Sequence, residues 1–328
     1  LKPRKMPDSG YPGLAFSGGC DSSAALCIMP ENTIPVFLER PMIENSMYNS
    51  EAALKSCDLV KDLGYHIEIV ESNFEYIRNP VGFPSDLAHA SVLLLLAENL
   101  NLDSISFGTV LESSYGVGHE RFRDYGNGSH WKLYSNLFKS VGIELSLPVC
   151  GISEVGTAII CEKSPMGYIS QSCIRGEWKE PCLKCWKCFR KQLLSCSLGF
   201  QNFSTEEFKE NINTLDVYSK LKKIPISHEN VLSFSVQKLN ISDCEELRLL
   251  EKRLLNLEEV DFLEKWYSPS REFGSEKYRR IINDKIVKIL ATMDFDEEKI
   301  VEKWSMEKFI KLKSTKKNSD ILCKSLLK

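Results

Sequence analysis

The stretch LAFSGGCDSSAALC, residues 14–27, joins a short apolar run to a run of helix-forming residues through two glycines. A turn from a strand into a helix leaves the first N–H groups of the helix unpaired, and the helix dipole adds positive charge there. Gly18 and Gly19 let the backbone approach an anion closely. Further polar groups come from Ser17, Asp21, Ser22 and Ser23. The stretch therefore predicts a phosphate-binding loop, with an ordinary helix cap as the alternative.

The order of patterns around this loop predicts an α/β fold. Strand-like runs stand at YPGLAF (11–16), IPVFLE (34–39), HIEIVES (66–72) and SISFGTV (104–110). Helical patterns alternate with them at 22–29, 50–64, 85–101 and 131–142. This alternation is typical of a doubly wound, mostly parallel sheet with helices on both faces, which binds ligands at the carboxyl ends of its strands.

A change of pattern near residue 199 predicts two domains. Residues 1–198 carry the α/β pattern, whereas 199–328 carry charged, amphipathic helical patterns with few strand signals. We expect the second domain to be mostly helical and its lysine-rich end, 313–328, to be a frayed tail.

Composition narrows the class of protein. The 328 residues have a net charge of −3, which disfavours both a strongly basic nucleic-acid binder and an acidic, solvated chain. No apolar run approaches the roughly 18 residues of a membrane helix. The first residues lack the apolar core of a secretory signal, so we expect a cytoplasmic protein.

Four of the twelve cysteines crowd into the segment SCIRGEWKEPCLKCWKCFRK, residues 172–191. Four thiolates at this C-x8-C-x2-C-x2-C spacing can close a tetrahedron around zinc and leave no open position, which is typical of a structural site. The predicted ligands are Cys173, Cys182, Cys185 and Cys188. An iron–sulfur cluster, a sulfur-carrying C-x-x-C pair and unligated cysteines are the alternatives.

The loop Ser-Gly-Gly-x-Asp-Ser resembles the PP-loop of the N-type ATP pyrophosphatases. Over residues 12–195 the chain resembles the 7-cyano-7-deazaguanine synthase family, some of whose relatives stand in bacterial antiphage operons. The likeness rests on the loop, on residues 76–113, on LPVCGISEVG (147–156) and on the cysteine segment. The chain departs from the family where LERPMIENS (38–46) replaces a Gly-Gln pair, and in its helical remainder.

The resemblance implies an ATP- and Mg²⁺-dependent ligase that adenylates the carboxylate of a 7-carboxy-7-deazaguanine-type substrate and releases pyrophosphate. Acyl transfer to ammonia would give an amide and then a nitrile, and transfer to a protein amine would give a conjugate. The residues that would bind ATP are Phe16, Ser17, Gly18, Gly19, Asp21, Ser22 and Ser23, with Asp21 and Ser22 also catalytic.

We expect two kinds of residue to contact the substrate: a pair that matches the family's motif, and charged residues that can bind a carboxylate, a phosphate or a guanine-like edge. Arg78 and Asn79 match the Arg-Asn pair of the family. A carboxylate such as Glu112 can accept from a guanine-like edge, and guanidinium groups bind carboxylates and phosphates. The guanidinium candidates are Arg121, Arg123 and Arg175.

Two other functions stay open at this stage. A PP-loop protein of the tRNA-thiolating type would use a cysteine persulfide, and a degenerate PP-loop protein would be a non-catalytic, ATP-binding interaction subunit. The expected partner is a small deazaguanine, and a protein acceptor would dock on residues 199–328. The sequence is compatible with a homo-oligomer, and neither a membrane nor a nucleic acid is expected as a partner.

Overall fold

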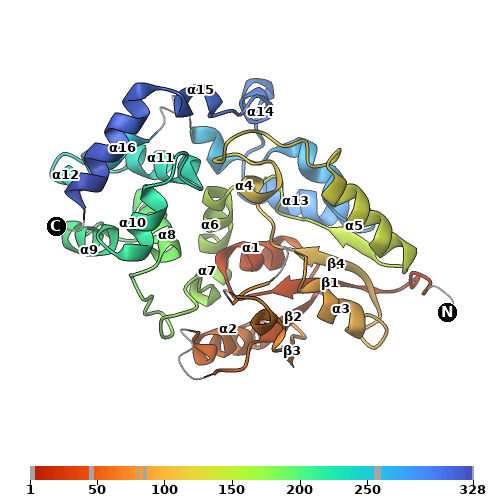
Figure 1. Cartoon of the computed structure of the whole chain (residues 1–328). Coiled ribbons are helices and arrows are strands. Elements are labelled where there is room, and N and C mark those ends of the chain that lie inside the picture. Colours follow the sequence, from red (N-terminus) through yellow and green to blue (C-terminus); the bar gives the residue numbers. More distant parts are fainter. Residues whose placement is uncertain (1–3, 44–47, 80, 84–86, 255–259, 327–328) are drawn as a thin grey trace.

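The computed structural model describes residues 4–43, 48–79, 81–83, 87–254 and 260–326, with one parallel sheet at the centre (Figure 1). Its strands are β1 (Tyr11–Phe16), β2 (Ile34–Glu39), β3 (Glu68–Glu71), β4 (Leu102–Phe107) and β5 (Glu144–Ser146). They pair in parallel in the order β3-β2-β1-β4-β5. The chain winds outward in both directions from β1, so the neighbouring ends of β1 and β4 form the switch point at which such sheets bind ligands.

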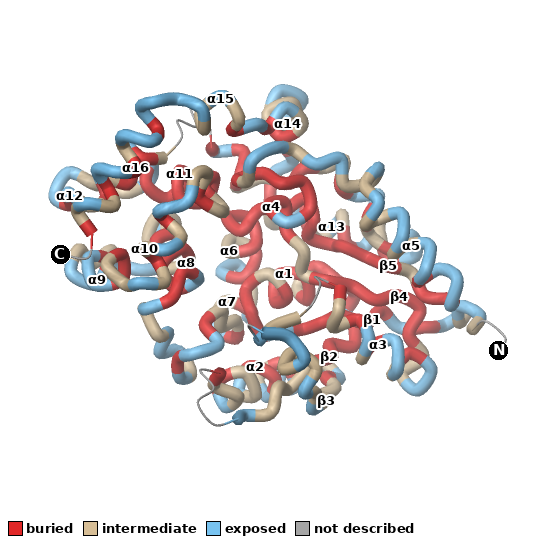
Figure 2. Tube along the Cα trace, viewed as in Figure 1, coloured by how far each residue is buried: buried red, intermediate tan, exposed pale blue. Residues whose placement is uncertain are grey.

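Alternating side chains of the sheet pack against helices on both faces. Leu14 and Phe16 of β1 pack on one face, and Ala15 between them packs on the other. The first face is covered by α1 (Cys20–Ile28), α2 (Ser50–Asp62), α6 (Glu154–Glu162) and α13 (Arg279–Ile289). The second is covered by α3 (Ala90–Leu96) and α5 (Ser129–Ser140). The central strands are therefore buried (Figure 2), and the predicted doubly wound sheet is confirmed.

Short helices complete the α/β part. They are α4 (Leu111–Ser114), which follows β4, and α7 (Met166–Ile169), which follows α6. The helix predicted over 85–101 is shorter in the described residues. Asn101 takes a left-handed conformation with a φ of 51°, and this turns the chain into β4. Sequence reasoning did not find the short strand β5.

The remaining helices form a second cluster around α8 (Trp186–Ser197). Its members are α9 (Thr205–Ile212), α10 (Leu215–Leu221), α11 (Glu229–Lys238), α12 (Glu245–Arg253) and α16 (Lys313–Ser325). The expected frayed tail over 313–328 is wrong, because α16 is a helix that packs on α12. Its buried residues Thr315, Ser319 and Leu322 recur every three or four positions, so one face of the helix is covered.

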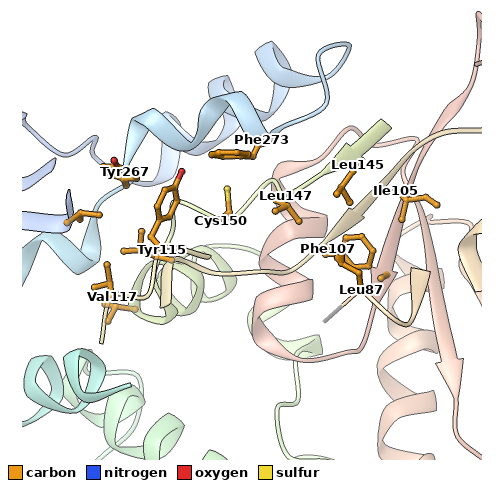
Figure 3. Close-up of a cluster of buried hydrophobic side chains, with 14 of the residues drawn as sticks. Leu87, Ile105, Phe107, Tyr115, Val117, Leu145, Leu147, Cys150, Tyr267 and Phe273 are labelled. Carbon is orange, nitrogen blue, oxygen red and sulfur yellow. The ribbon is translucent and has the colours of Figure 1, made fainter. Parts of the chain in front are cut away.

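The segment 260–306 returns from the helical cluster to the sheet. It contains α14 (Phe295–Glu302) and is followed by α15 (Glu307–Ile310). Tyr267 and Phe273 of this segment pack around Tyr115 in the same core as the sheet residue Phe107 (Figure 3). The boundary predicted at residue 198 stays a prediction, and this packing crosses it.

None of the helices within the described ranges has both the length and the apolar content that a membrane crossing requires.

We predict that a chain ended after residue 198 does not unfold cooperatively. It would lack Phe262, Tyr267 and Phe273, each at most 3% exposed. Each large side chain lost from a core costs about 3–5 kcal/mol. Thermal unfolding monitored by circular dichroism measures the cooperativity of the transition. The control is a chain ended after residue 311, which keeps the side chains that complete the sheet and should melt cooperatively. A native-like transition for residues 1–198 would contradict the prediction.

Candidate functional site

The loop between β1 and α1 is braced by its own hydroxyl groups. Ser22 Oγ accepts from the Ser17 N–H at 3.2 Å and donates to the carbonyl oxygen of Gly19 at 3.0 Å. Gly18 has a φ of 71°, a backbone conformation that favours glycine. Within the described residues the N–H groups of Gly18, Asp21 and Ser22 have no acceptor. The loop thus presents unpaired donors at the positive end of α1, which is the arrangement that binds anions.

A cavity of about 440 Å³ opens above this loop at the carboxyl ends of the strands. Five of the seven predicted ATP-binding residues line it: Phe16, Ser17, Gly19, Asp21 and Ser22. Gly18 and Ser23 do not, and the buried Ser23 hydroxyl has no hydrogen-bond partner among the residues that the structure describes. Apolar side chains from β2 and β4 form another part of the wall, including Val36, Leu38 and Phe107. The cavity therefore combines an anion-binding end with an apolar wall.

Gly108, directly after β4, makes the closest approach to the loop. A Cβ atom at this position would lie 2.8 Å from the backbone nitrogen of Ser22 and 2.9 Å from the carbonyl carbon of Asp21. Both contacts are with backbone, which cannot move aside as a flexible side chain can. Any side chain at position 108 would therefore displace the first turn of α1.

We predict that Gly108→Ala displaces the loop without unfolding the protein. The overlap should cost about 1–3 kcal/mol of the free energy of unfolding and should speed hydrogen exchange in residues 17–23. Gly274→Ala is the matched control, because a Cβ there meets only Arg271 O at 3.5 Å. Urea titration and hydrogen exchange followed by mass spectrometry give the two readouts, and equal exchange in both variants would refute the close approach.

The Asp21 carboxylate forms a hydrogen bond and an ion pair with residues of α6 and α8 that sequence reasoning did not assign to the site. Its Oδ1 accepts from Thr157 Oγ1 at 2.9 Å and from Lys191 Nζ at 3.3 Å. Lys191 also lies 3.4 Å from Glu154, which receives two hydrogen bonds from the Arg190 guanidinium. Burial alone would raise the pKa of Glu154, but Lys191 and Arg190 hold that pKa well below its usual range. The loop carboxylate is therefore fixed by a charged network from α6 and α8.

Glu112 belongs to this interior network. Its carboxylate accepts from the Glu154 N–H at 3.1 Å and from Asn230 Nδ2 at 2.8 Å. Burial, followed by the negative charge of Glu154, raises the pKa of Glu112 to about 8. The side chain is fully buried and does not line the cavity, so the structure places it behind the site.

The predicted arginines and asparagine also lie outside this cavity. Arg78 is exposed and donates to Phe83 O at 2.8 Å, and Asn79 beside it is exposed. Arg121 and Arg123 are exposed on the segment that follows α4. Arg175 lines a neighbouring cavity of about 480 Å³, which shares Tyr48 with the first cavity.

Other charged residues occupy the cavity wall instead. Arg40 follows β2 and Glu75 follows β3, and they form an ion pair at 3.3 Å. The Arg40 guanidinium also lies 4.5 Å from the ring centre of Tyr48. Lys187, at the start of α8, is exposed at the edge and has no ion pair within the described ranges. The position of Arg40 and Glu75 just beyond two strand ends was the signal that could have identified them.

The four predicted metal ligands meet in one group. The sulfur atoms of Cys173, Cys182, Cys185 and Cys188 all lie within 4.8 Å of one another. A single zinc ion with Zn–S bonds of about 2.3 Å needs sulfur separations of roughly 4 Å. The Cys182 and Cys188 sulfurs are 3.8 Å apart, and the N–H groups of these two residues donate to the sulfurs of Cys173 and Cys185. The group therefore fits a metal ion, as predicted.

We predict that the protein binds about one zinc ion per chain and that Cys185→Ser abolishes this binding. The four thiolates are then all ligands, so none is left as a reactive thiol. Metal analysis of the purified protein measures the content, with Cys196→Ser as the control outside the group. Stoichiometric iron with the visible absorption of an iron–sulfur cluster would contradict the choice of metal.

Comparisons with known proteins add the following. A family model described as "Family of unknown function (DUF6395)" matches residues 133–305. The chain is similar to the structure of the U34-tRNA thiolase NcsA from Methanococcus maripaludis with its 4Fe-4S cluster, at 16% identity and a TM-score of 0.37. That alignment covers 63% of this chain and 70% of the thiolase. No curated protein matches the chain.

Proposed function

Because the chain belongs to this family of unknown function, we propose its activity from its own residues: it binds ATP and transfers AMP to a carboxylate, releasing pyrophosphate. The observation that carries the proposal is the glycine loop. Its unpaired N–H groups stand at the switch point of the sheet, and two of the residues that carry them, Asp21 and Ser22, line a cavity with an apolar wall. The triphosphate would bind at the loop, and the adenine would pack on the apolar wall.

Three groups supply the charge that this reaction requires. Both described contacts of Asp21 go to Oδ1, which leaves Oδ2 to hold Mg²⁺, a cation that prefers carboxylate oxygens. Lys187 stands at the edge of the cavity, where its ammonium can neutralise phosphate oxygens. Lys191 is already paired with Asp21 and positions that carboxylate. Catalysis by orientation and charge neutralisation needs no side-chain nucleophile.

We propose further that the carboxylate belongs to a 7-carboxy-7-deazaguanine-type molecule and that an amine then displaces AMP. The support for this finer assignment is the sequence resemblance alone. Arg40 is the cavity-lining cation suited to the carboxylate, in place of the more distant Arg78. Arg175, in the adjoining cavity, is suited to a substrate that extends past Tyr48.

The proposal is tested by measuring pyrophosphate and AMP release from ATP and Mg²⁺, with and without 7-carboxy-7-deazaguanine. Release should depend on the deazaguanine and should fall about 100-fold in Asp21→Asn, because the variant loses the charge at the loop. Asp58→Asn, which removes an exposed carboxylate from α2, is the matched control and should keep full activity. Adding ammonium or a protein amine then identifies the acceptor.

Each other result has a defined meaning. ATP binding without any release of pyrophosphate would support a non-catalytic subunit. Pyrophosphate release that does not depend on the deazaguanine would contradict the substrate class. Full activity of Asp21→Asn would contradict the role of the loop.

A further inference from the structure

A second cavity, of about 550 Å³, lies against the same glycine loop and shares Lys187 with the first cavity. Gly19 and Asp21 line the first cavity, whereas Cys20 between them lines the second. Cys161 of α6 lines the second cavity as well. A small solute in this cavity can therefore reach these two thiols, and also the predicted metal ligands Cys173 and Cys188, which line it as well.

These two thiols form a contact pair. Their sulfur atoms are 3.7 Å apart, and the Cys161 sulfur lies 3.3 Å from the Cys20 carbonyl oxygen. A disulfide bond is about 2.05 Å long, so the sulfurs must approach by about 1.7 Å. Among the described cysteines outside the metal-binding group, no other two sulfurs are in hydrogen-bond contact.

The surroundings make the two thiols unequal. Cys20 is the first residue of the nine-residue helix α1, where the helix dipole favours a thiolate. The hydrogen bond between the two thiols, aided by the positive charge of Lys191, lowers the pKa of Cys20 against the effect of burial. The same hydrogen bond and burial raise the pKa of Cys161 well above its ordinary value. One sulfur is thus suited to attack an oxidant, and its neighbour keeps its proton.

We propose that Cys20 and Cys161 are a site of reversible oxidation by hydroperoxides, and that the disulfide disables the loop. The Cys20 thiolate attacks the O–O bond of hydrogen peroxide, which forms a sulfenic acid and, after protonation, one water. The Cys161 thiol then attacks the sulfenic sulfur, so that the S–S bond forms and a second water leaves. Two thiols are oxidised and one peroxide is reduced to two waters. A dithiol reverses the change by exchange.

The disulfide must disturb the loop because α6 contacts Asp21 at the same place. Thr157, one turn before Cys161, donates to the Asp21 carboxylate. The Cys20 N–H donates to Ser172 Oγ at 3.3 Å, which anchors the loop on its other side. Drawing Cys20 toward α6 changes both contacts together. The expected loss of ATP binding rests on the proposed function, whereas the oxidation site itself does not.

The experiment treats the full-length, metal-loaded protein with hydrogen peroxide and maps disulfides by mass spectrometry of its peptides. Hydrogen exchange in residues 17–23 and ATP binding are measured before oxidation, after it, and after dithiothreitol. Cys161→Ala and Cys161→Ser remove the partner sulfur. Cys27→Ser, in the same helix α1 and without a sulfur neighbour among the described residues, is the matched control. Metal content is followed to show that the four-cysteine group stays intact.

The expected result is a linked Cys20–Cys161 peptide in the wild type and in Cys27→Ser. Loop exchange should change, ATP should bind at least about tenfold more weakly, and dithiothreitol should restore both. Both Cys161 variants can form the Cys20 sulfenic acid but no disulfide, so their loop exchange and ATP binding should change less than those of the wild type under the same oxidation.

The absence of the linked peptide in wild type, or a linked peptide with unchanged loop exchange, would overturn the proposal. If the reduced protein bound no ATP, the proposed function would fail. The linked Cys20–Cys161 peptide and the hydrogen exchange of residues 17–23 would still show whether the two thiols are an oxidation site.

Discussion

The ion pair between Lys191 and Asp21 connects the glycine loop to the helix that begins within the four-cysteine group, two features that lie far apart in the sequence. Lys191 lies on α8, whose first turn contains the predicted metal ligand Cys188, and Asp21 lies in the glycine loop. Whatever fixes the position of α8 therefore also fixes the carboxylate of the loop. A metal ion bound by the four cysteines would act on the loop through this helix, although no ligand of the metal lines the first cavity.

Burying such a network has a cost that the fold must offset. An isolated buried carboxylate is strongly unfavourable, and pairing stabilises it only when its hydrogen bonds are also satisfied. Glu154 meets this condition through Arg190, Lys191 and the N-terminus of α6. The helical cluster also contributes, because His228, at the start of α11, lies 3.2 Å from Glu154 and Asn230 bonds Glu112. The helices that follow residue 199 thus complete the support of the loop as well as forming their own core.

Sequence reasoning was most reliable where local chemistry determines the structure. The strand–glycine–helix pattern and the cysteine spacing act over few residues, so the parallel sheet and the four-sulfur group could be predicted. The position of Glu112 could not, because its burial depends on Asn230, more than a hundred residues away in the chain. Arg40 and Glu75 were missed because a charged residue after a strand is common, and only the folded cavity shows that both belong to one wall. The helix α16 was mistaken for a tail because its many lysines make the sequence look fully solvent-exposed, although one narrow face of the helix is buried.

The return of segment 260–306 to the sheet has a consequence for how the protein is made. Strands β1 to β4 are complete once residue 107 has been synthesised, but part of their core comes from Tyr267 and Phe273. A ribosome adds about 5–20 residues per second, so the early strands wait roughly 8–33 s for the residues that cover them. During that interval apolar strand edges are exposed, and such edges pair readily with other chains. The nascent chain therefore exposes part of its apolar sheet surface until the residues that cover it have been made.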